Sequence, residues 1–274
     1  MNKPYNKLNQ NDKNIIILNY YNNVDLNFKE LASICNVSER AFSRVLKENN
    51  INTKLKNRYI IKNEHYFDNI DTETKAYFLG LLFADGYVGS NNEIILYLKD
   101  IGNTYYVLNV LIKELESNIK IKRMDTKNKE GCFKSNSFFY KLNMSNKCLN
   151  NALKQHGVGN HKKSSRFEIP KDVLSNNLEN HFIRGLFDGD GSVYLKNKNK
   201  PTPQKTVSFL ANPSLLLQIK HILEKELKLN NVQIRKSYNS DKISELRYGG
   251  NNQVQRISNY LYSNANIYLS HKKF

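Results

Sequence analysis

The sequence has few cysteines, few acidic residues and no long run of apolar residues. Only three cysteines occur among the 274 residues, at positions 35, 132 and 148, and no two of them form a CxxC pair. This scarcity argues against a disulfide framework and a zinc ribbon, and it indicates a reducing compartment. The six histidines form no HExxH or His-x-His cluster, so we expect ordinary surface or buried side chains rather than metal ligands.

Apolar segments in this chain are short. The longest apolar run, from Ala76 to Ala84, cannot span a bilayer. Polar residues follow Met1, so we expect no secretory signal. These absences predict a protein without a membrane partner. We expect it not to be secreted and to be located in the cytoplasm of a bacterial or phage-infected cell, or in an organelle.

Positive charge exceeds negative charge by a wide margin. The chain has 42 Lys and Arg residues against 25 Asp and Glu residues, which gives a formal net charge of +17. Together with 17 tyrosines and 13 phenylalanines, this surplus suits a polyanionic partner such as nucleic acid. A lysine surplus also follows from AT-rich coding, so charge alone leaves a merely solvated basic surface open.

Two similar stretches, residues 77–88 and 182–193, stand out from the rest of the chain. Each has large apolar residues around a glycine, then a small residue followed by Asp-Gly, and each ends in a valine. Asp190 of the second stretch follows Asp85 of the first by 105 residues. Because a glycine follows each aspartate where a helix would stop, each stretch predicts a helix that ends abruptly before a strand.

Each stretch carries two small residues four positions apart, as Gly80 and Ala84 are in the first. This spacing places them on one helix face, where two backbones can approach closely. If the two helices pack in parallel, Asp85 and Asp190 meet at helix C-termini. The helix dipole and mutual repulsion both disfavour two carboxylates there. A divalent cation relieves both effects, so the pattern predicts a metal site with one Asp from each half.

At these motifs the chain resembles the LAGLIDADG homing endonucleases, in their single-chain form with two motifs. The nine-residue signature of the family matches residues 78–86 and 183–191. The family's metal-binding acid falls on Asp85 and Asp190. The first copy departs at Phe83, where the family often has Asp, whereas the second copy keeps that acid as Asp188. The resemblance implies Mg²⁺ as the cofactor, with Mn²⁺ as a substitute, and double-stranded DNA as the partner.

The pattern after the first motif recurs after the second. The first half predicts strands at 93–99, 119–122 and 139–144 and helices at 105–115 and 146–156. The second half predicts strands at 193–196, 206–210, 232–235 and 245–248 and helices at 215–227 and 253–262. An αββαββα order present twice is an internal duplication and an α+β fold. The resemblance covers residues 65–274 and implies two pseudo-symmetric halves, 71–170 and 171–274, that form a DNA-binding saddle of two four-stranded sheets.

The N-terminal part predicts a small all-α helix-turn-helix domain at residues 1–52. Apolar residues recur with helical spacing over 28–34, break at Asn36 and resume over 41–46. Asn36 can adopt the left-handed conformation of a tight turn, and Ser38 can cap the second helix. The recognition helix, 39–48, would present to a major groove Glu39, Arg40, Ser43, Arg44 and Lys47. An ordinary helical hairpin is the alternative, and residues 53–70 form a basic linker.

Helices can cover only one face of each predicted sheet, so the other face meets solvent or a partner. Basic and amide side chains gather on this open face: Lys99, Lys120, Lys122, Lys141, Asn143, Lys196, Gln233, Arg235 and Arg247. Such groups donate hydrogen bonds to phosphates and to major-groove base edges. We therefore expect these faces to bind DNA, with a merely soluble sheet surface as the alternative.

The resemblance also implies a basic residue near each scissile phosphate. Lys163 and Lys273 occupy the family's position for this role, in which the cation orients water or neutralises charge. Lys162 and Lys272 are the neighbouring alternatives, and a generic phosphate contact is an alternative role.

Asp100 and Asn212 stand in matching places after the second strand of each half. They resemble the family's polar water-positioning site, with helix capping as the alternative.

The expected function is that of a monomeric, divalent-metal-dependent endodeoxyribonuclease. It makes a double-strand break with short 3′ overhangs at a long asymmetric target, in the homing of an intron or mobile gene. The alternative is a non-cleaving nucleic-acid-binding protein on the same fold, either an RNA maturase or a DNA-binding regulator.

Overall fold

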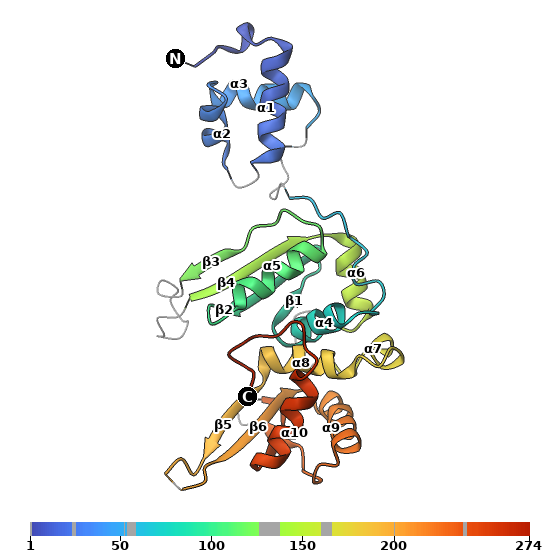
Figure 1. The fold of residues 1–274 in the computed structure, drawn as a ribbon. Coiled ribbons are helices and arrows are strands. Elements are labelled where there is room, and N and C mark those ends of the chain that lie inside the picture. The colour runs from blue at the N-terminus through green and yellow to red at the C-terminus, as the bar shows by residue number, and fades with distance from the viewer. Residues whose placement is uncertain are drawn as a thin grey trace. The chain divides into compact units, whose positions relative to one another are not determined.

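The computed structural model separates into two compact units, residues 1–60 and 61–274 (Figure 1). It describes residues 2–23, 26–51, 53, 59–125, 138–159, 166–199, 201–237 and 240–274. Among these residues, no helix combines the length and the apolar character that crossing a membrane requires.

The first unit is built on three helices. These are α1 (Gln10–Asn22), α2 (Phe28–Ile34) and α3 (Glu39–Glu48), after a 3₁₀ turn at Tyr5–Lys7. Asn36 has a φ of 52°, and Ser38 Oγ accepts a hydrogen bond from Ala41 N at 3.2 Å. The tight turn and the cap that the sequence predicted between α2 and α3 are therefore confirmed. Leu31 and Phe42 are fully buried where the two helices pack.

The second unit contains two copies of one arrangement. The first copy comprises α4 (Glu73–Asp85), β1 (Gly86–Val88), β2 (Glu93–Lys99), α5 (Thr104–Glu114), β3 (Lys122–Asp125), β4 (Phe138–Ser145) and α6 (Lys147–Gln155). The second comprises α8 (Glu179–Asp190), β5 (Ser192–Lys196), β6 (Gln204–Ala211), α9 (Pro213–Leu227), β7 (Arg235–Ser237), β8 (Ser240–Gly249) and α10 (Asn251–Tyr262). A short helix that the sequence did not predict, α7 (Lys171–Ser175), precedes α8.

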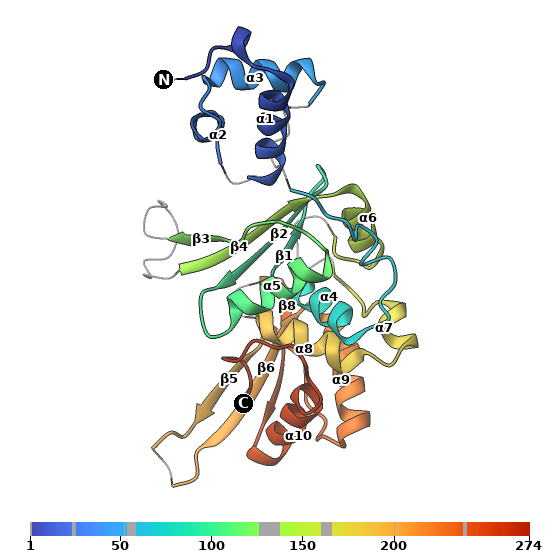
Figure 2. The same cartoon turned by 45° about the horizontal axis from the view of Figure 1, so that its top comes forward.

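The two antiparallel sheets have the same strand order, β1-β2-β4-β3 and β5-β6-β8-β7. Helices α9 and α10 lie on one face of the second sheet, as α5 does on the first (Figures 1 and 2). Ile94, Leu96 and Leu98 alternate along β2 of the first sheet and are buried. The α+β class and the internal duplication are thus confirmed.

Two predicted strands begin later than the sequence indicated. The strand expected at 119–122 begins only at Lys122, and the strand expected at 232–235 begins only at Arg235. Lys120 and Gln233 therefore lie in the segments that lead into β3 and β7, and both are exposed. The alternation of apolar and polar residues was misleading here because Ile119 is buried without being paired in a ladder.

Candidate functional site

Helices α4 and α8 pack backbone against backbone. A Cβ added at Gly80 would lie 2.0 Å from the carbonyl oxygen of Phe182, and one added at Gly185 would lie 2.0 Å from that of Tyr77. Both contacts follow the 105-residue offset of the motifs, so the helix pair has approximate two-fold symmetry. The close approach that the sequence predicted is confirmed, because only hydrogen fits at these positions.

Asp85 and Asp190 are the last residues of α4 and α8, and both are half-buried. A Cβ added at Gly189 would lie 3.1 Å from Asp85 Oδ2. The Asp85 carboxylate therefore lies against the end of α8, next to the residue that precedes Asp190. The structure thus brings the ends of the two motifs together, as the parallel packing of their helices requires.

Two cations close the ends of the motif helices. Arg166 is 3% exposed and donates through Nη2 to the Gly86 carbonyl at 2.7 Å, and through Nη1 to that of Phe83. Lys272 Nζ donates at 2.6 Å to the carbonyl of Gly191, which is equivalent to Gly86. Helix C-termini carry partial negative charge, which favours a cation at each of these places.

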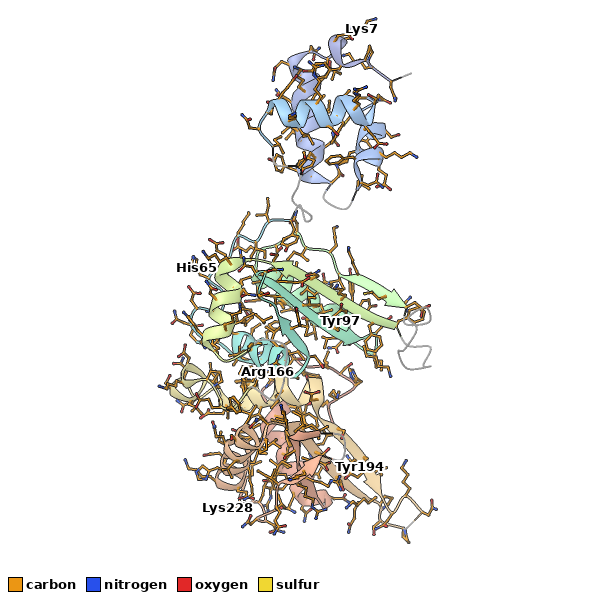
Figure 3. The ribbon with its side chains drawn as sticks, turned by 180° about the vertical axis from the view of Figure 1, so that it is seen from behind. Lys7, His65, Tyr97, Arg166, Tyr194 and Lys228 are labelled. Carbon is orange, nitrogen blue, oxygen red and sulfur yellow. The ribbon has the colours of Figure 1, made fainter. Side chains whose placement is uncertain are left out.

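Arg166 also responds to both motif carboxylates. Burial lowers the pKa of its guanidinium to about 10, while the negative charges of Asp190 and Asp85 act in the opposite direction. One buried cation thus interacts electrostatically with both carboxylates, at the place where the two halves meet (Figure 3). Arg166 was not predicted from the sequence, although it lies only three residues after Lys163, in the stretch that was matched to Lys272 and Lys273.

The lysines that were predicted to lie near the scissile phosphates differ in where the structure places them. Lys162 and Lys163 lie outside the described residues. In the second half, Lys273 lies over the ring of Tyr268, with Nζ 4.9 Å from the ring centroid. The neighbouring Lys272 is the residue that reaches the end of α8.

Asp100 and Asn212 do not share one environment. Arg123 Nε donates to Asp100 Oδ2 at 2.7 Å, and this hydrogen bond lowers the pKa of the carboxyl. Asn212 Oδ1 accepts from Ser214 N at 2.9 Å and caps α9. The capping alternative therefore describes Asn212, whereas Asp100 holds a basic residue of β3.

Two charged residues of α8 form buried polar contacts with residues of α4. The α8 residue Arg184 is fully buried and donates through Nη2 to Glu73 Oε1 of α4 at 2.8 Å. Another α8 residue, Asp188, accepts hydrogen bonds from Tyr77 Oη of α4 at 2.8 Å and from Tyr262 Oη at 2.6 Å. Burial raises the pKa of Asp188 to about 6.

Phe83 stands where the second motif has Asp188. Its ring packs edge-on against Phe182, with centroids 5.0 Å apart. The departure from the family signature at this position therefore replaces a buried hydrogen-bonding group with an aromatic packing contact.

The strand registers place most of the predicted basic and amide residues on the open sheet faces. Lys122 and Tyr97 both oppose Lys141, so these three side chains share a face. Register likewise groups the other members with them: Lys99 and Asn143 on the first sheet, and Lys196, Arg235 and Arg247 on the second. Tyr97 and Tyr194 mark these two faces in Figure 3.

The open face of the second sheet carries a cavity of about 370 Å³, lined by Lys196, Thr206, Gln233, Arg235 and Arg247 among others. The Arg247 guanidinium lies over the Tyr194 ring at 5.6 Å and is held by Glu245, with Nη2 2.6 Å from Oε2. The buried Thr206 hydroxyl at the lining has no hydrogen-bond partner within the described part of the chain. This cavity therefore combines three cations with a polar group that could accept or donate a further hydrogen bond.

Helix α3 in the first unit exposes part of the predicted recognition set. Arg40 and Lys47 are exposed, and Ser43 is half-buried. Arg44 is held by Glu48, with Nε 3.1 Å from Oε1, and lies over the Tyr5 ring at 4.0 Å. Among the cations of α3, Arg40 and Lys47 are thus exposed, whereas Arg44 is held in an ion pair within the helix.

Residues 177–260 match the family model of the LAGLIDADG-like domain. This part of the chain is therefore similar to a LAGLIDADG-like domain. The match covers α8 with its Asp-Gly motif and both long strands of the second sheet. The first half, outside the match, has the same strand order and also a helix-end aspartate.

Solved structures with a similar fold include the homing endonuclease I-WcaI bound to its DNA recognition sequence. That chain is 17% identical, with a TM-score of 0.52, over 81% of this chain and 93% of that one. At this identity the similarity shows the fold, two four-stranded sheets flanked by helices. No curated protein sequence matches the chain significantly.

Two more distant structures are full-length WhiA from Thermatoga maritima and I-SmaMI bound to an uncleaved DNA target in the presence of calcium ions. The WhiA chain is 16% identical, with a TM-score of 0.45. The match covers 73% of this chain and 60% of the WhiA chain, so this chain spans less than two thirds of the length of WhiA. I-SmaMI is 11% identical, with a TM-score of 0.44, over 72% of this chain and 86% of that one.

Proposed function

We propose that this protein is a monomeric endonuclease that makes a metal-dependent double-strand break at a long asymmetric DNA target. The observation that carries the proposal is the meeting of Asp85 and Asp190 at the joined ends of two helices. Carboxylates are disfavoured at helix C-termini, where the helix dipole is negative, and a bound cation would relieve this effect. The open, basic sheet faces on either side supply the DNA-binding surface.

The donor set at the helix ends fits Mg²⁺. Asp85 and Asp190 offer hard oxygen ligands, and both side chains are accessible enough to meet a phosphate. These two residues would hold the metal, with phosphate oxygens of both strands as further ligands. When bound, the metal activates a water nucleophile and stabilises the leaving oxygen.

The chain's own side chains divide the remaining tasks. Arg166 holds the backbone at the end of α4, which fixes the position of Asp85. Lys272 holds the end of α8 and provides positive charge beside Asp190, where charge develops on the scissile phosphate. One acid from each half suits one cut in each strand, and two unlike halves suit an asymmetric target.

Selection of cleavage sites from a randomised DNA library tests the proposal. The full chain is incubated with the library and Mg²⁺, and the cut ends are sequenced. We expect enrichment of one long asymmetric sequence with short 3′ overhangs, and no cutting when EDTA replaces Mg²⁺. Recovery of a bound but uncut sequence would contradict the nuclease and favour the non-cleaving alternative.

The first unit is proposed to add contacts to the same DNA. Replacing Arg40 and Lys47 together with alanine should weaken binding of the full chain. It should also reduce the slope of log affinity against log salt by about 2, because each cation that contacts a phosphate releases one counterion. The matched control is Lys29→Ala on α2, which removes one positive charge from the same unit. An unchanged slope in the Arg40/Lys47 variant would remove the case for a DNA-reading helix.

A further inference from the structure

The segment that follows α10, residues 263–274, crosses from the second half to the first. We call this segment the strap. Ile267 and Leu269 of the strap are 4% and 2% exposed. The ring of Phe274 lies against Phe187 at 5.3 Å and Tyr262 at 5.9 Å between ring centroids. The strap is therefore packed into the unit along its length rather than lying loosely on it.

Polar contacts anchor the strap to the first half. At the start of α5, Asn103 Nδ2 donates to the carbonyl of Tyr268 at 2.9 Å, and Asn103 Oδ1 accepts from Ser270 N at 2.7 Å. Farther back, Asn266 donates to Glu73 of α4 through both its backbone N and its side-chain Nδ2, at 2.8 and 2.7 Å. Three residues of the strap thus bond to two elements of the first half.

Buried charged groups of α8 anchor the strap to the second half. Arg184 Nε donates to the carbonyl of Ile267 at 3.0 Å, and Asp188 Oδ2 accepts from Leu269 N at 2.6 Å. Both groups are held from α4 as well, by Glu73 and Tyr77. The path of the strap is therefore fixed just before it reaches Lys272, whose Nζ meets the Gly191 carbonyl one residue beyond Asp190.

We propose that the strap is a positioning element for one of the two strand cuts, in which Asn103 of the first half sets the place of Lys272 in the second. This inference rests on the proposed nuclease function. The contacts of Asn103 hold Tyr268 and Ser270, and Ser270 is two residues from Lys272. In the first half, the described residue that holds the end of the motif helix is Arg166, which precedes α7 and is not part of the strap. Loosening the strap should therefore affect the cut beside Asp190 and spare the cut beside Asp85.

Strand-resolved cleavage by the full-length Asn103→Ala variant tests this positioning role. A displacement of about 1 Å near the reacting groups costs up to roughly 100-fold in rate. We therefore expect one strand to be cut roughly 10- to 100-fold more slowly, the other at the normal rate, and nicked DNA to accumulate. DNA affinity should stay unchanged. Equal slowing of both strands would indicate a merely structural role and would overturn the inference.

The matched control is Asn109→Ala on the same helix, whose amide donates to the carbonyl of Tyr105 within α5. We expect it to cut both strands normally. In a Lys272→Ala background, Asn103→Ala should cause no further strand-specific loss, since its effect passes through Lys272. An additional loss there would contradict this route. If the unmodified protein cuts neither strand, the proposed function fails, whereas a normal strand ratio in Asn103→Ala overturns the strap's role alone.

Discussion

Asp85→Asn and Asp190→Asn should each abolish double-strand cleavage and leave DNA affinity nearly unchanged. Each substitution removes one anionic metal ligand at the joined helix ends while keeping the shape of the side chain. The expected loss in rate at the affected strand is roughly 10³-fold or more, because a bound metal contributes several kcal/mol to such reactions. Strand-resolved cleavage with Mg²⁺, together with gel-shift binding, measures both quantities.

The same two variants make a second expectation measurable. Without metal, each variant should change the free energy of unfolding only slightly, because it removes a carboxylate that the helix C-terminus disfavours but also removes negative charge that favours the buried Arg166 cation. Asp68→Asn, which removes the same charge outside the motifs, serves as the control and should cut normally. Full double-strand cleavage by either motif variant would refute the assignment of the metal to Asp85 and Asp190.

Gly185→Ala should produce a large loss of stability, because it adds a methyl group to the tightest contact of the helix pair. The new Cβ would stand 2.0 Å from the backbone carbonyl oxygen of Tyr77, which cannot rotate away as a side chain could. Overpacking of this kind typically costs 1–3 kcal/mol and sometimes more. Calorimetry of the full chain should show a lower midpoint for the unit formed by residues 61–274, and cutting of both strands should fall.

Gly249→Ala is the matched control, because its new Cβ would meet no atom closer than Thr206 Oγ1 at 3.7 Å. It should leave the midpoint of that unit nearly unchanged. By the two-fold relation, Gly80→Ala should behave as Gly185→Ala does, since its Cβ would lie 2.0 Å from the carbonyl of Phe182. Equal midpoints for Gly185→Ala and Gly249→Ala would mean that α4 and α8 can separate without cost.

The sequence predicted the features that depend on short spacings. Gly80 and Gly185 indicated a close helix contact, and Asn36 indicated a left-handed turn. A close backbone contact and a positive φ are local requirements that only a few residue types satisfy. The internal repeat then supplied the order of helices and strands along both halves, since one half could be compared with the other.

The features that the sequence did not predict depend on contacts between distant segments. Arg166 lies 83 residues after Phe83, to whose carbonyl it donates a hydrogen bond, and no local pattern marks that pairing. Asp100 was matched to Asn212 by position alone, but Asp100 bonds to Arg123 on the edge strand β3, whereas Asn212 caps α9. Repeats diverge where their neighbours differ, so position within a repeat predicts the backbone better than it predicts side-chain partners.

The buried charged residues that contact α4 belong to α8, and this makes the two halves non-interchangeable. In an assembly of two second halves, the position of Glu73 would be taken by Leu178 and that of Tyr77 by Phe182, so Arg184 and Asp188 would each be buried facing an apolar side chain. Both groups would keep their contacts within the second half but lose their α4 partners, and loss of one partner from a buried charged group is unfavourable. Splitting the gene into its halves should therefore yield complementary fragments that assemble only with each other, which would prevent a symmetric by-product from competing for palindromic DNA.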